Sequence, residues 1–558
     1  MKQIWVICLT AWLILTASCR NGSGRQAAAN DPAEPRIVNI INFVRLCEPR
    51  IAEFTEEVLY QTVVEQVKIM RAHKLKGTFL LQYDALMDPR YQQLMKSLPR
   101  DTFEVGAWWE IPQPLVEHAG MKWRGRFPWD WHANVGFSTG YTPEQREKLV
   151  DVYMEAFRKI FGATPKSVGS WFIDAHTMNY LYDKYKITGS CNCKDQYGTD
   201  GYTLWGGYWG QAYYPSRLNS YMPAQTEEHQ LPVPVFRMLG SDPVRQYDQG
   251  VSSNGQGVIT LEPVYPYGGG DSAWVHWYFT EFEAGTSLEF NYAQTGQENS
   301  FTWGAMAKGF TLQMPLIAKL RDERKVKVET LGESAKWFRE RYKTTPATSV
   351  TISKDLEGSD RKTAWFNSRF YRVNLLWENG RLRIRDIHLF DEDLLSFYTK
   401  GVATSNACEF LTLPFVDGYL WSSKDKIAGM QLKAVVDGKD VFLEGADPGF
   451  SEPRSGVLGV SWPLLNVAGT LKIEMDEQSL SMNLEGNKEA RWHLELVAGD
   501  NAKLPFTMIG SRTIDCEFQG MEYSVVCERG TFHKSGANGA FEILPDEGEL
   551  KLNLAERN

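Results

Sequence analysis

The stretch GSWFIDAHT, Gly169–Thr177, places an aspartate between an apolar run and a helical pattern. The segment KSVGSWFID (166–174) has the apolar continuity of a buried strand. The residues that follow, HTMNYLYDKY (176–185), have the spacing of an amphipathic helix. The stretch is therefore half of a β–α–β unit, and the flanking sequence repeats that unit.

Apolar runs alternate with helical patterns from residue 36 to about 345. Further strands are expected at 36–44, 76–84, 103–110, 187–193, 233–239, 257–263 and 287–294. Helices are expected at 56–73, 142–162 and 302–323, and one more strand and helix are expected within 325–342. Thr142 is the expected N-cap of the helix at 142–162, and Pro143 is its first residue. Strands that are apolar throughout and separated by helices imply a parallel sheet covered on both faces. With about eight such strands, we predict an α/β fold in which residues 36–347 form a (β/α)7-8 barrel.

The pattern changes at about residue 348. Runs such as RLRIRDIHLF alternate apolar and polar residues, and turns such as ENG and VDGK connect them. This alternation with Asn-Gly and Asp-Gly turns is typical of antiparallel hairpins. We therefore predict that residues 348–558 form an antiparallel β-sandwich, so that the 558-residue chain has two main domains.

The N-terminus has the features of an export signal. A lysine at position 2 precedes an apolar core and the small residues before Cys19. The segment resembles a bacterial lipoprotein signal, which implies a signal peptide over residues 1–18 and lipidation of Cys19. Residues 19–35 are rich in Gly, Ala, Asn and Pro, as in a flexible tether. We expect a chain anchored by lipid to the bacterial outer membrane, facing the periplasm or the surface; ordinary secretion is the alternative.

Composition narrows the class of partner. The net charge is -9 and no long basic run is present, so the chain lacks the footprint of a nucleic-acid-binding protein. Aromatic residues make up 13% of the chain, and many fall in the loops after predicted strands. Aromatic loops are costly to expose without a ligand, and sugar rings stack on such side chains. An oligosaccharide or polysaccharide is therefore the expected partner.

The cysteines allow two further interpretations. Cys516 and Cys527 flank a predicted hairpin and are the best candidates for a disulfide. Cys191 and Cys193 share one face of a predicted strand and could bind a metal with Cys47, but we favour small buried residues. We expect no metal and no cofactor.

Acidic residues recur where predicted barrel strands end. In parallel barrels the functional side chains gather at the carboxyl ends of the strands. The acids at or after these ends are Asp84, Glu110, Asp174, Asp195, Asp200, Asp242, Glu262 and Glu298. Trp109, Trp171 and Trp205 lie in the same regions. Acids interleaved with aromatic residues on one rim predict a carbohydrate site.

Two families share local patterns with this chain. GSWFIDAHT resembles the Gly-x-Trp-x-x-Glu segment of glycoside hydrolase family 57, with Gly169 and Trp171 matching and Asp174 in the place of the nucleophile. GTFLLQYDAL lies where the related polysaccharide deacetylases carry their Asp-Asp metal motif. Larger stretches resemble bacterial surface lipoproteins of unassigned function that join such a barrel to a C-terminal β domain. The resemblance implies a carbohydrate-active barrel enzyme.

Glycoside hydrolysis requires two carboxyl groups, one as acid and the other as nucleophile or base. We predict Asp174 as the nucleophile, and Glu298, beside Gln297, as the acid/base. Glu262 is the reserve for the second role. Asp84 and Glu110 are candidates for orienting substrate, with Arg45 and His176 as polar contacts. Asp200 and the three tryptophans complete the expected binding residues.

Three alternatives stay open. Asp174 could simply cap the helix that follows it. The chain could be a polysaccharide deacetylase-like metal hydrolase, although none of its nine histidines has the paired spacing that such enzymes use. It could also be a non-catalytic surface protein that binds glycans. Other glycan-utilisation proteins of the cell surface are possible partners in any of these cases.

Overall fold

The structure is a computed structural model that describes residues 35–535 and 540–556. The predicted signal peptide, Cys19 and residues 19–34 of the predicted tether lie outside the described residues. Within the described part of the chain, no helix combines the length and apolar character needed to cross a membrane.

Seven parallel strands form a nearly closed, barrel-like sheet in the order β10-β1-β2-β3-β4-β5-β9. They are β1 (Arg36–Val44), β2 (Gly77–Leu81), β3 (Phe103–Trp108), β4 (Ser167–Gly169), β5 (Gly189–Cys193), β9 (Val235–Met238) and β10 (Asn291–Thr295). Two short strands extend the sheet, β11 (Lys327–Glu329) beside β1 and β8 (Ala212–Tyr213) beside β9. Between β9 and β10, the backbone N–H of Leu239 donates to the side chain of Gln294 at 2.6 Å. Side chains therefore bridge the seam where the ladder stops.

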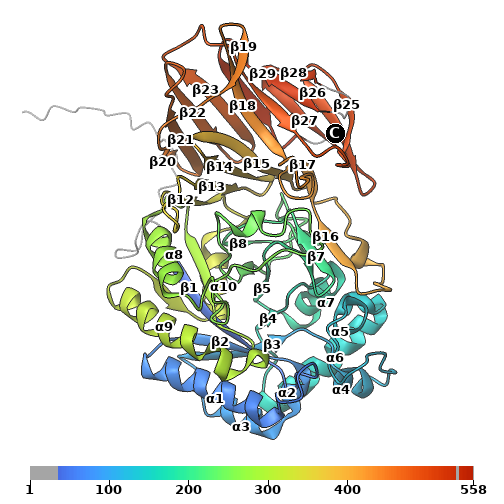
Figure 1. The fold of residues 1–558 in the computed structure, drawn as a ribbon. Coiled ribbons are helices and arrows are strands. Elements are labelled where there is room, and N and C mark those ends of the chain that lie inside the picture. Colours follow the sequence, from blue (N-terminus) through green and yellow to red (C-terminus); the bar gives the residue numbers. More distant parts are fainter. Residues whose placement is uncertain (1–34, 536–539, 557–558) are drawn as a thin grey trace, which may run out of the picture. The chain divides into compact units, whose positions relative to one another are not determined.

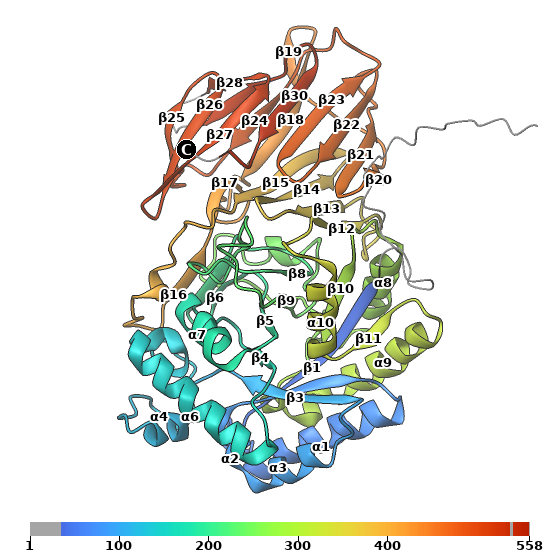
Figure 2. The same cartoon turned by 180° about the vertical axis from the view of Figure 1, so that it is seen from behind.

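Helices α1 (Glu56–Ala72), α6 (Pro143–Phe161) and α9 (Thr302–Asp322) lie on the outer side of this sheet, as Figures 1 and 2 show. The other described α-helices are α2 (Tyr83–Met87), α3 (Pro89–Lys96), α4 (Gln113–His118), α5 (Ala133–Gly136), α7 (Ala175–Tyr185), α8 (Ser272–Ala284) and α10 (Leu331–Arg341). Helix α10 begins at the amino ends of the strands, where the Leu331 N–H donates to Thr78 Oγ1 at 2.9 Å. The start of α6 follows the prediction: Thr142 caps it, Gln145 completes a capping box, and Pro143 is its first residue. Leu149, Tyr153 and Phe157 are buried on one face of α6.

The C-terminal half contains two antiparallel sheets. The first has ten strands: β12 (Thr348–Ile352), β13 (Lys362–Asn367), β14 (Tyr371–Glu378), β15 (Arg381–Leu389), β17 (Leu413–Asp417), β18 (Gly429–Val436), β19 (Lys439–Phe442), β24 (Trp492–Val497), β28 (Thr531–Lys534) and β29 (Phe541–Leu544). The second has eight: β20 (Gly449–Arg454), β21 (Val457–Pro463), β22 (Thr470–Met475), β23 (Ser479–Glu485), β25 (Phe506–Ile509), β26 (Thr513–Phe518), β27 (Met521–Arg529) and β30 (Glu549–Asn553). Asn379 and Gly380 both have positive φ between β14 and β15, as the predicted Asn-Gly hairpin turn requires.

A small third sheet joins distant parts of the sequence. The hairpin of β6 (Gln196–Thr199) and β7 (Tyr202–Trp205) follows β5, and β16 (Cys408–Leu411) pairs with β7 in parallel. No local pattern predicts this pairing. It brings residues from the C-terminal half against a loop of the barrel.

Two expectations about the fold were wrong. Residues 257–263 form no strand; Leu261 donates to the carbonyl of Leu239, and Gly269 donates back to Thr260, so the segment is a tight loop. Cys516 and Cys527 are free thiols. They do flank a hairpin, but in its register Cys516 lies opposite Tyr523, which leaves Cys527 several residues further along.

Candidate functional site

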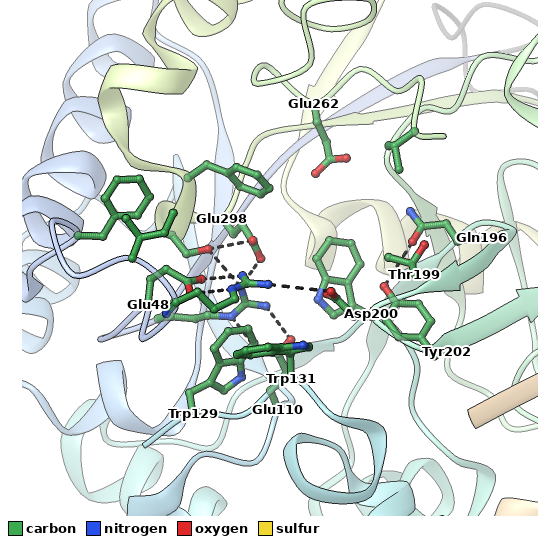
Figure 3. Close-up of a pocket in the computed structure, with 18 of the residues that line it drawn as sticks. Glu48, Glu110, Trp129, Trp131, Gln196, Thr199, Asp200, Tyr202, Glu262 and Glu298 are labelled. Atoms are coloured by element: carbon green, nitrogen blue, oxygen red, sulfur yellow. Dashed lines mark hydrogen bonds and ion pairs between the residues drawn. The ribbon is translucent and has the colours of Figure 1, made fainter. Parts of the chain in front are cut away.

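A cavity of about 410 Å³ opens at the carboxyl end of the barrel strands. Its lining side chains come from the loops after β1, β3, β4, β5, β9 and β10, and several of them are shown in Figure 3. They include the charged residues Arg45, Glu48, Arg50, Glu110, Asp200, Glu262 and Glu298 and the aromatic residues Trp129, Trp131, Phe137, Trp171, Tyr202 and Tyr265. Acids and aromatic rings thus converge on one rim, as expected.

Arg45 lies at the centre of the acidic side of the cavity. Its Nε and Nη2 donate to the two oxygens of Glu110 at 2.9 and 2.7 Å, and its Nη1 lies 2.5 Å from Glu298 Oε2. The guanidinium stacks over Trp129 at 4.2 Å from the ring centroid. Burial alone lowers the pKa of Arg45, but the charges of Glu110 and Glu298 raise it above its ordinary value. Arg45 is therefore a permanent cation shared by two buried carboxylates.

Glu262 and Glu298 lie in different surroundings within the cavity. Glu262 accepts hydrogen bonds only from neutral groups, Thr260 Oγ1 at 2.9 Å and Gln297 Nε2 at 3.0 Å. Burial raises the pKa of Glu262 to about 7, and the charge of Glu298 contributes in the same direction. Burial also raises the pKa of Glu298, and Arg45 opposes part of that shift. Only Glu298 has a cation beside it, so the charged form is favoured more at Glu298 than at Glu262.

The opposite side of the cavity carries polar side chains that can bind the hydroxyl groups of a ligand. Gln196, Thr199 and Tyr202 lie across from Glu298 (Figure 3). At the mouth, the guanidinium of Arg50 stacks over Trp131 at 4.9 Å and donates to both oxygens of Glu48 at 2.7 and 2.6 Å.

Asp200 lies at the edge of this mouth. Its carboxylate is 4.0 Å from Arg50 Nη1, and the side chain is 44% exposed. An exposed carboxylate at that distance from its cation remains free to meet a ligand.

Seven of the predicted site residues meet at this cavity. Arg45, Glu110, Trp171, Asp200, Glu262 and Glu298 line it, and Gln297 contacts it through Glu262. The other predicted residues, Asp84, Trp109, Asp174, His176 and Trp205, do not line it.

Asp174 requires the main correction. Strand β4 ends at Gly169, five residues earlier, and Asp174 is the N-cap of α7, accepting from the backbone N–H of Thr177 at 2.9 Å. Its carboxylate also accepts from Ser138 Oγ at 2.6 Å and from Arg146 Nη1 at 2.9 Å. All of these groups are buried. A carboxylate saturated by its neighbours in this way cannot act as the nucleophile of the cavity, so the capping alternative is correct.

Asp84 and Trp109 also belong to the packing around the barrel. Asp84 lies in the first turn of α2 and accepts from the backbone N–H of Ala85 at 2.7 Å. Burial raises its pKa to about 7, although that hydrogen bond opposes the shift. Trp109 is fully buried and packs edge-on against Tyr153 of α6. Neither side chain therefore lines the cavity.

His176 and Trp205 have other partners. The ring of His176 is paired with Glu147 at 3.0 Å on the outer side of α7. Trp205 is fully buried and donates its Nε1 proton to Asp417 of β17 at 2.9 Å. Trp205 therefore joins the β6–β7 hairpin to the ten-stranded sheet.

Glu48, Arg50 and Tyr265 line the cavity but were not predicted as site residues. Glu48 and Arg50 follow Arg45 closely in the loop after β1, so the strand-end rule could have found them if applied beyond the first residue. Tyr265 lies in the same loop as Glu262, just beyond the residues that were wrongly predicted to form a strand.

Over the described ranges, no three His, Cys, Asp or Glu side chains lie close enough to hold a metal ion. Cys191 and Cys193 are fully buried, as favoured above.

No family model matches the sequence, and no curated protein matches it. Several solved structures show a remote likeness. A protein of Parabacteroides distasonis described as a "putative glycoside hydrolase/deacetylase" is 14% identical, with a TM-score of 0.48 over 68% of this chain and 90% of that one. The 4-alpha-glucanotransferase of Thermococcus litoralis is 10% identical, with a TM-score of 0.29 over 93% and 99% of the two chains. A GH57 branching enzyme of Thermococcus kodakaraensis is also 10% identical, with a TM-score of 0.29 over 55% and 71%.

Proposed function

We propose that this protein is a carbohydrate-active hydrolase that cleaves a glycosidic bond with Glu262 and Glu298. One observation carries the proposal: two buried carboxyl groups share an aromatic cavity but have opposite electrostatic surroundings. Glu262 has only neutral hydrogen-bond donors, while Glu298 lies 2.5 Å from Arg45. A pair of acids whose environments separate their protonation states is the arrangement that general acid and base roles require.

In this mechanism Glu262 is the acid. Its proton passes to the glycosidic oxygen as the bond to the anomeric carbon breaks, which leaves a neutral hydroxyl on the departing sugar. The Glu298 carboxylate either takes a proton from the attacking water or attacks the anomeric carbon itself. In the second case a water that gives its proton to the now ionised Glu262 cleaves the glycosyl ester and frees Glu298. Arg45, 2.5 Å away, favours the ionised form of Glu298 that both reactions require. The NMR signal of the first-formed anomer distinguishes retention from inversion.

The test is a panel of neutral, amino and acidic oligosaccharides, with product release followed by chromatography. Glu262→Gln and Glu298→Gln are each expected to lower turnover by about a thousandfold, because each removes a proton-transfer or nucleophilic group. The matched control is Glu340→Gln on α10, whose side chain is 68% exposed and should leave turnover unchanged. Full activity in either cavity variant contradicts the proposal.

Two other outcomes identify the alternatives. Release of acetate that stops on chelation indicates a polysaccharide deacetylase-like hydrolase. Binding of a glycan by the parent and by both variants, without turnover, indicates a non-catalytic glycan-binding protein.

We also propose that the chain is exported and anchored through Cys19, with residues 36–347 as the catalytic domain and 348–558 as the β domain. The support is the lipoprotein-like sequence before Cys19. In an expressing bacterium, Cys19→Ser should abolish incorporation of labelled palmitate and release the protein from the outer-membrane fraction. Unchanged labelling of the variant contradicts the anchor.

A further inference from the structure

One segment of the C-terminal half leaves the ten-stranded sheet and runs along the loops of the barrel. We call residues 396–411 the strap; it lies between β15 and β17 and includes β16. Its Ala403 N–H donates to the carbonyl of Thr139 at 2.8 Å, and Asn406 Oδ1 accepts from the Ala133 N–H at 3.2 Å. Both partners lie in the stretch that carries Phe137, a residue of the cavity wall.

The strap is tied to the barrel by Arg146. This fully buried arginine of α6 donates to the carbonyls of Tyr398 and Gly401 at 2.5 and 2.6 Å. Its charge is balanced by Asp174 at 2.9 Å. The attachment to the strap therefore consists of two hydrogen bonds from a charged donor, which are stronger than hydrogen bonds between neutral groups. Asp174 contributes by neutralising the donor.

The strap also adds a strand to the wall of the cavity. In the parallel pairing of β16 with β7, Cys408 is in register with Tyr202 and Leu411 with Trp205. Tyr202 lines the cavity, and Asp200 lies in the adjoining turn. A two-stranded hairpin alone is only marginally stable in water, so the third strand contributes to its order.

Aromatic rings connect the strap to the same wall. Phe410 lies 5.4 Å from Phe172, measured between ring centroids. Phe172 is stacked on Phe137 at 4.4 Å and lies 5.1 Å from Tyr202. Both Phe137 and Tyr202 line the cavity. Phe410 is therefore connected to the cavity residues Phe137 and Tyr202 through the ring of Phe172.

We propose that the strap is a positioning element of the candidate site and that Phe410 is its principal positioning residue. The strap fixes the wall formed by Phe137, Asp200 and Tyr202 and thereby sets how tightly the cavity holds a saccharide. The effect on saccharide binding rests on the proposed function, whereas the effect on the wall does not.

The experiment compares two full-length variants, Phe410→Ala and Phe532→Ala. Both phenylalanines are 2% exposed, but Phe532 lies in β28, at the end of the ten-stranded sheet, and packs against Phe541. Hydrogen exchange of residues 196–205 is expected to quicken at least about tenfold in Phe410→Ala but to change less than about twofold in Phe532→Ala. For the best saccharide of the panel, Phe410→Ala should raise KM about fivefold and leave kcat within about twofold.

Both the exchange rates and the kinetic constants test the role of the strap. Equal exchange of residues 196–205 in the two variants overturns the proposal, whatever the substrate, and a fall in kcat with unchanged KM overturns it as well. If the parent cleaves and binds no saccharide, the proposed function fails, while the exchange data still decide the role of the strap. If Phe410→Ala does not fold, Phe410→Leu is measured against Phe532→Leu with the same expected contrast.

Discussion

Arg45 Nη1 lies 2.5 Å from Glu298 Oε2, and both side chains are buried. The same guanidinium holds both oxygens of Glu110. One cation therefore balances two carboxylates, and the protonation state of the cavity depends on it.

Arg45→Met should expose this dependence. The variant keeps the apolar stem but leaves two buried acids unpaired, so its free energy of unfolding at pH 7 should fall by about 3 kcal/mol. The loss should shrink at lower pH, because burial raises the pKa of Glu298 and lets it take up a proton. Urea denaturation at pH 7 and at lower pH measures it. Arg90→Met, which removes a half-exposed arginine paired with Asp88, should cost less than about 1 kcal/mol. Equal losses in the two variants contradict this account.

Glu262 should make the stability depend on pH. Its folded pKa of about 7 lies above the ordinary value, so the folded protein binds a proton more tightly than the unfolded chain does. The stability contributed by that proton is complete at pH 4 and is lost as the pH rises through 7. Glu262→Gln cannot ionise, and it should be more stable than the parent by up to about 3 kcal/mol at pH 8 but not at pH 4. Parallel stability curves for the two proteins between pH 4 and 8 rule this out.

Asp174→Ala should destabilise the protein without removing the chemistry. Loss of the cap and of the partner of Arg146 should lower the free energy of unfolding by about 3 to 5 kcal/mol, as for other buried pairs that lose one member. The kcat of the folded fraction should stay within about twofold of the parent, because Asp174 does not reach the cavity. Glu298→Gln is the contrasting variant, folded but inactive. A stable Asp174→Ala protein with no turnover restores Asp174 as the nucleophile.

Trp131→Ala should weaken saccharide binding. Trp131 lines the cavity and carries the guanidinium of Arg50 over its ring, so removing it should raise the Kd for a bound oligosaccharide about tenfold, a typical effect for an aromatic contact residue. Titration calorimetry measures the change. Trp277→Ala removes a tryptophan of α8 that does not line the cavity and should leave Kd unchanged.

Much of the fold follows from short-range features. Helix α6 was predictable because Thr142, Gln145 and Pro143 act within its own first turn. The hairpin at Asn379 and Gly380 was predictable because only a few residue types adopt its turn. Residues 257–263 were not, because their apolar character serves loop contacts that only the folded chain provides.

Some residues of the candidate site could likewise be predicted from short-range features, and others could not. Arg45, Glu110 and Glu298 lie one, two and three residues after the ends of β1, β3 and β10, so the strand-end rule brings them to the cavity. Asp174 misled because β4 is shorter than its apolar run, and its true partner, Arg146, lies on another helix. Long-range contacts of this kind leave no periodic trace in the chain.

The parallel pairing of β16 with β7 has a consequence for synthesis on the ribosome. A nascent chain that has just completed α10 already contains every carboxyl group of the cavity, yet the wall around Tyr202 still lacks its outer strand. Translation must proceed through Leu411 before that wall can close. A chain that terminates between the end of α10 and Leu411 should therefore contain the acidic residues of the cavity but fail to bind a saccharide.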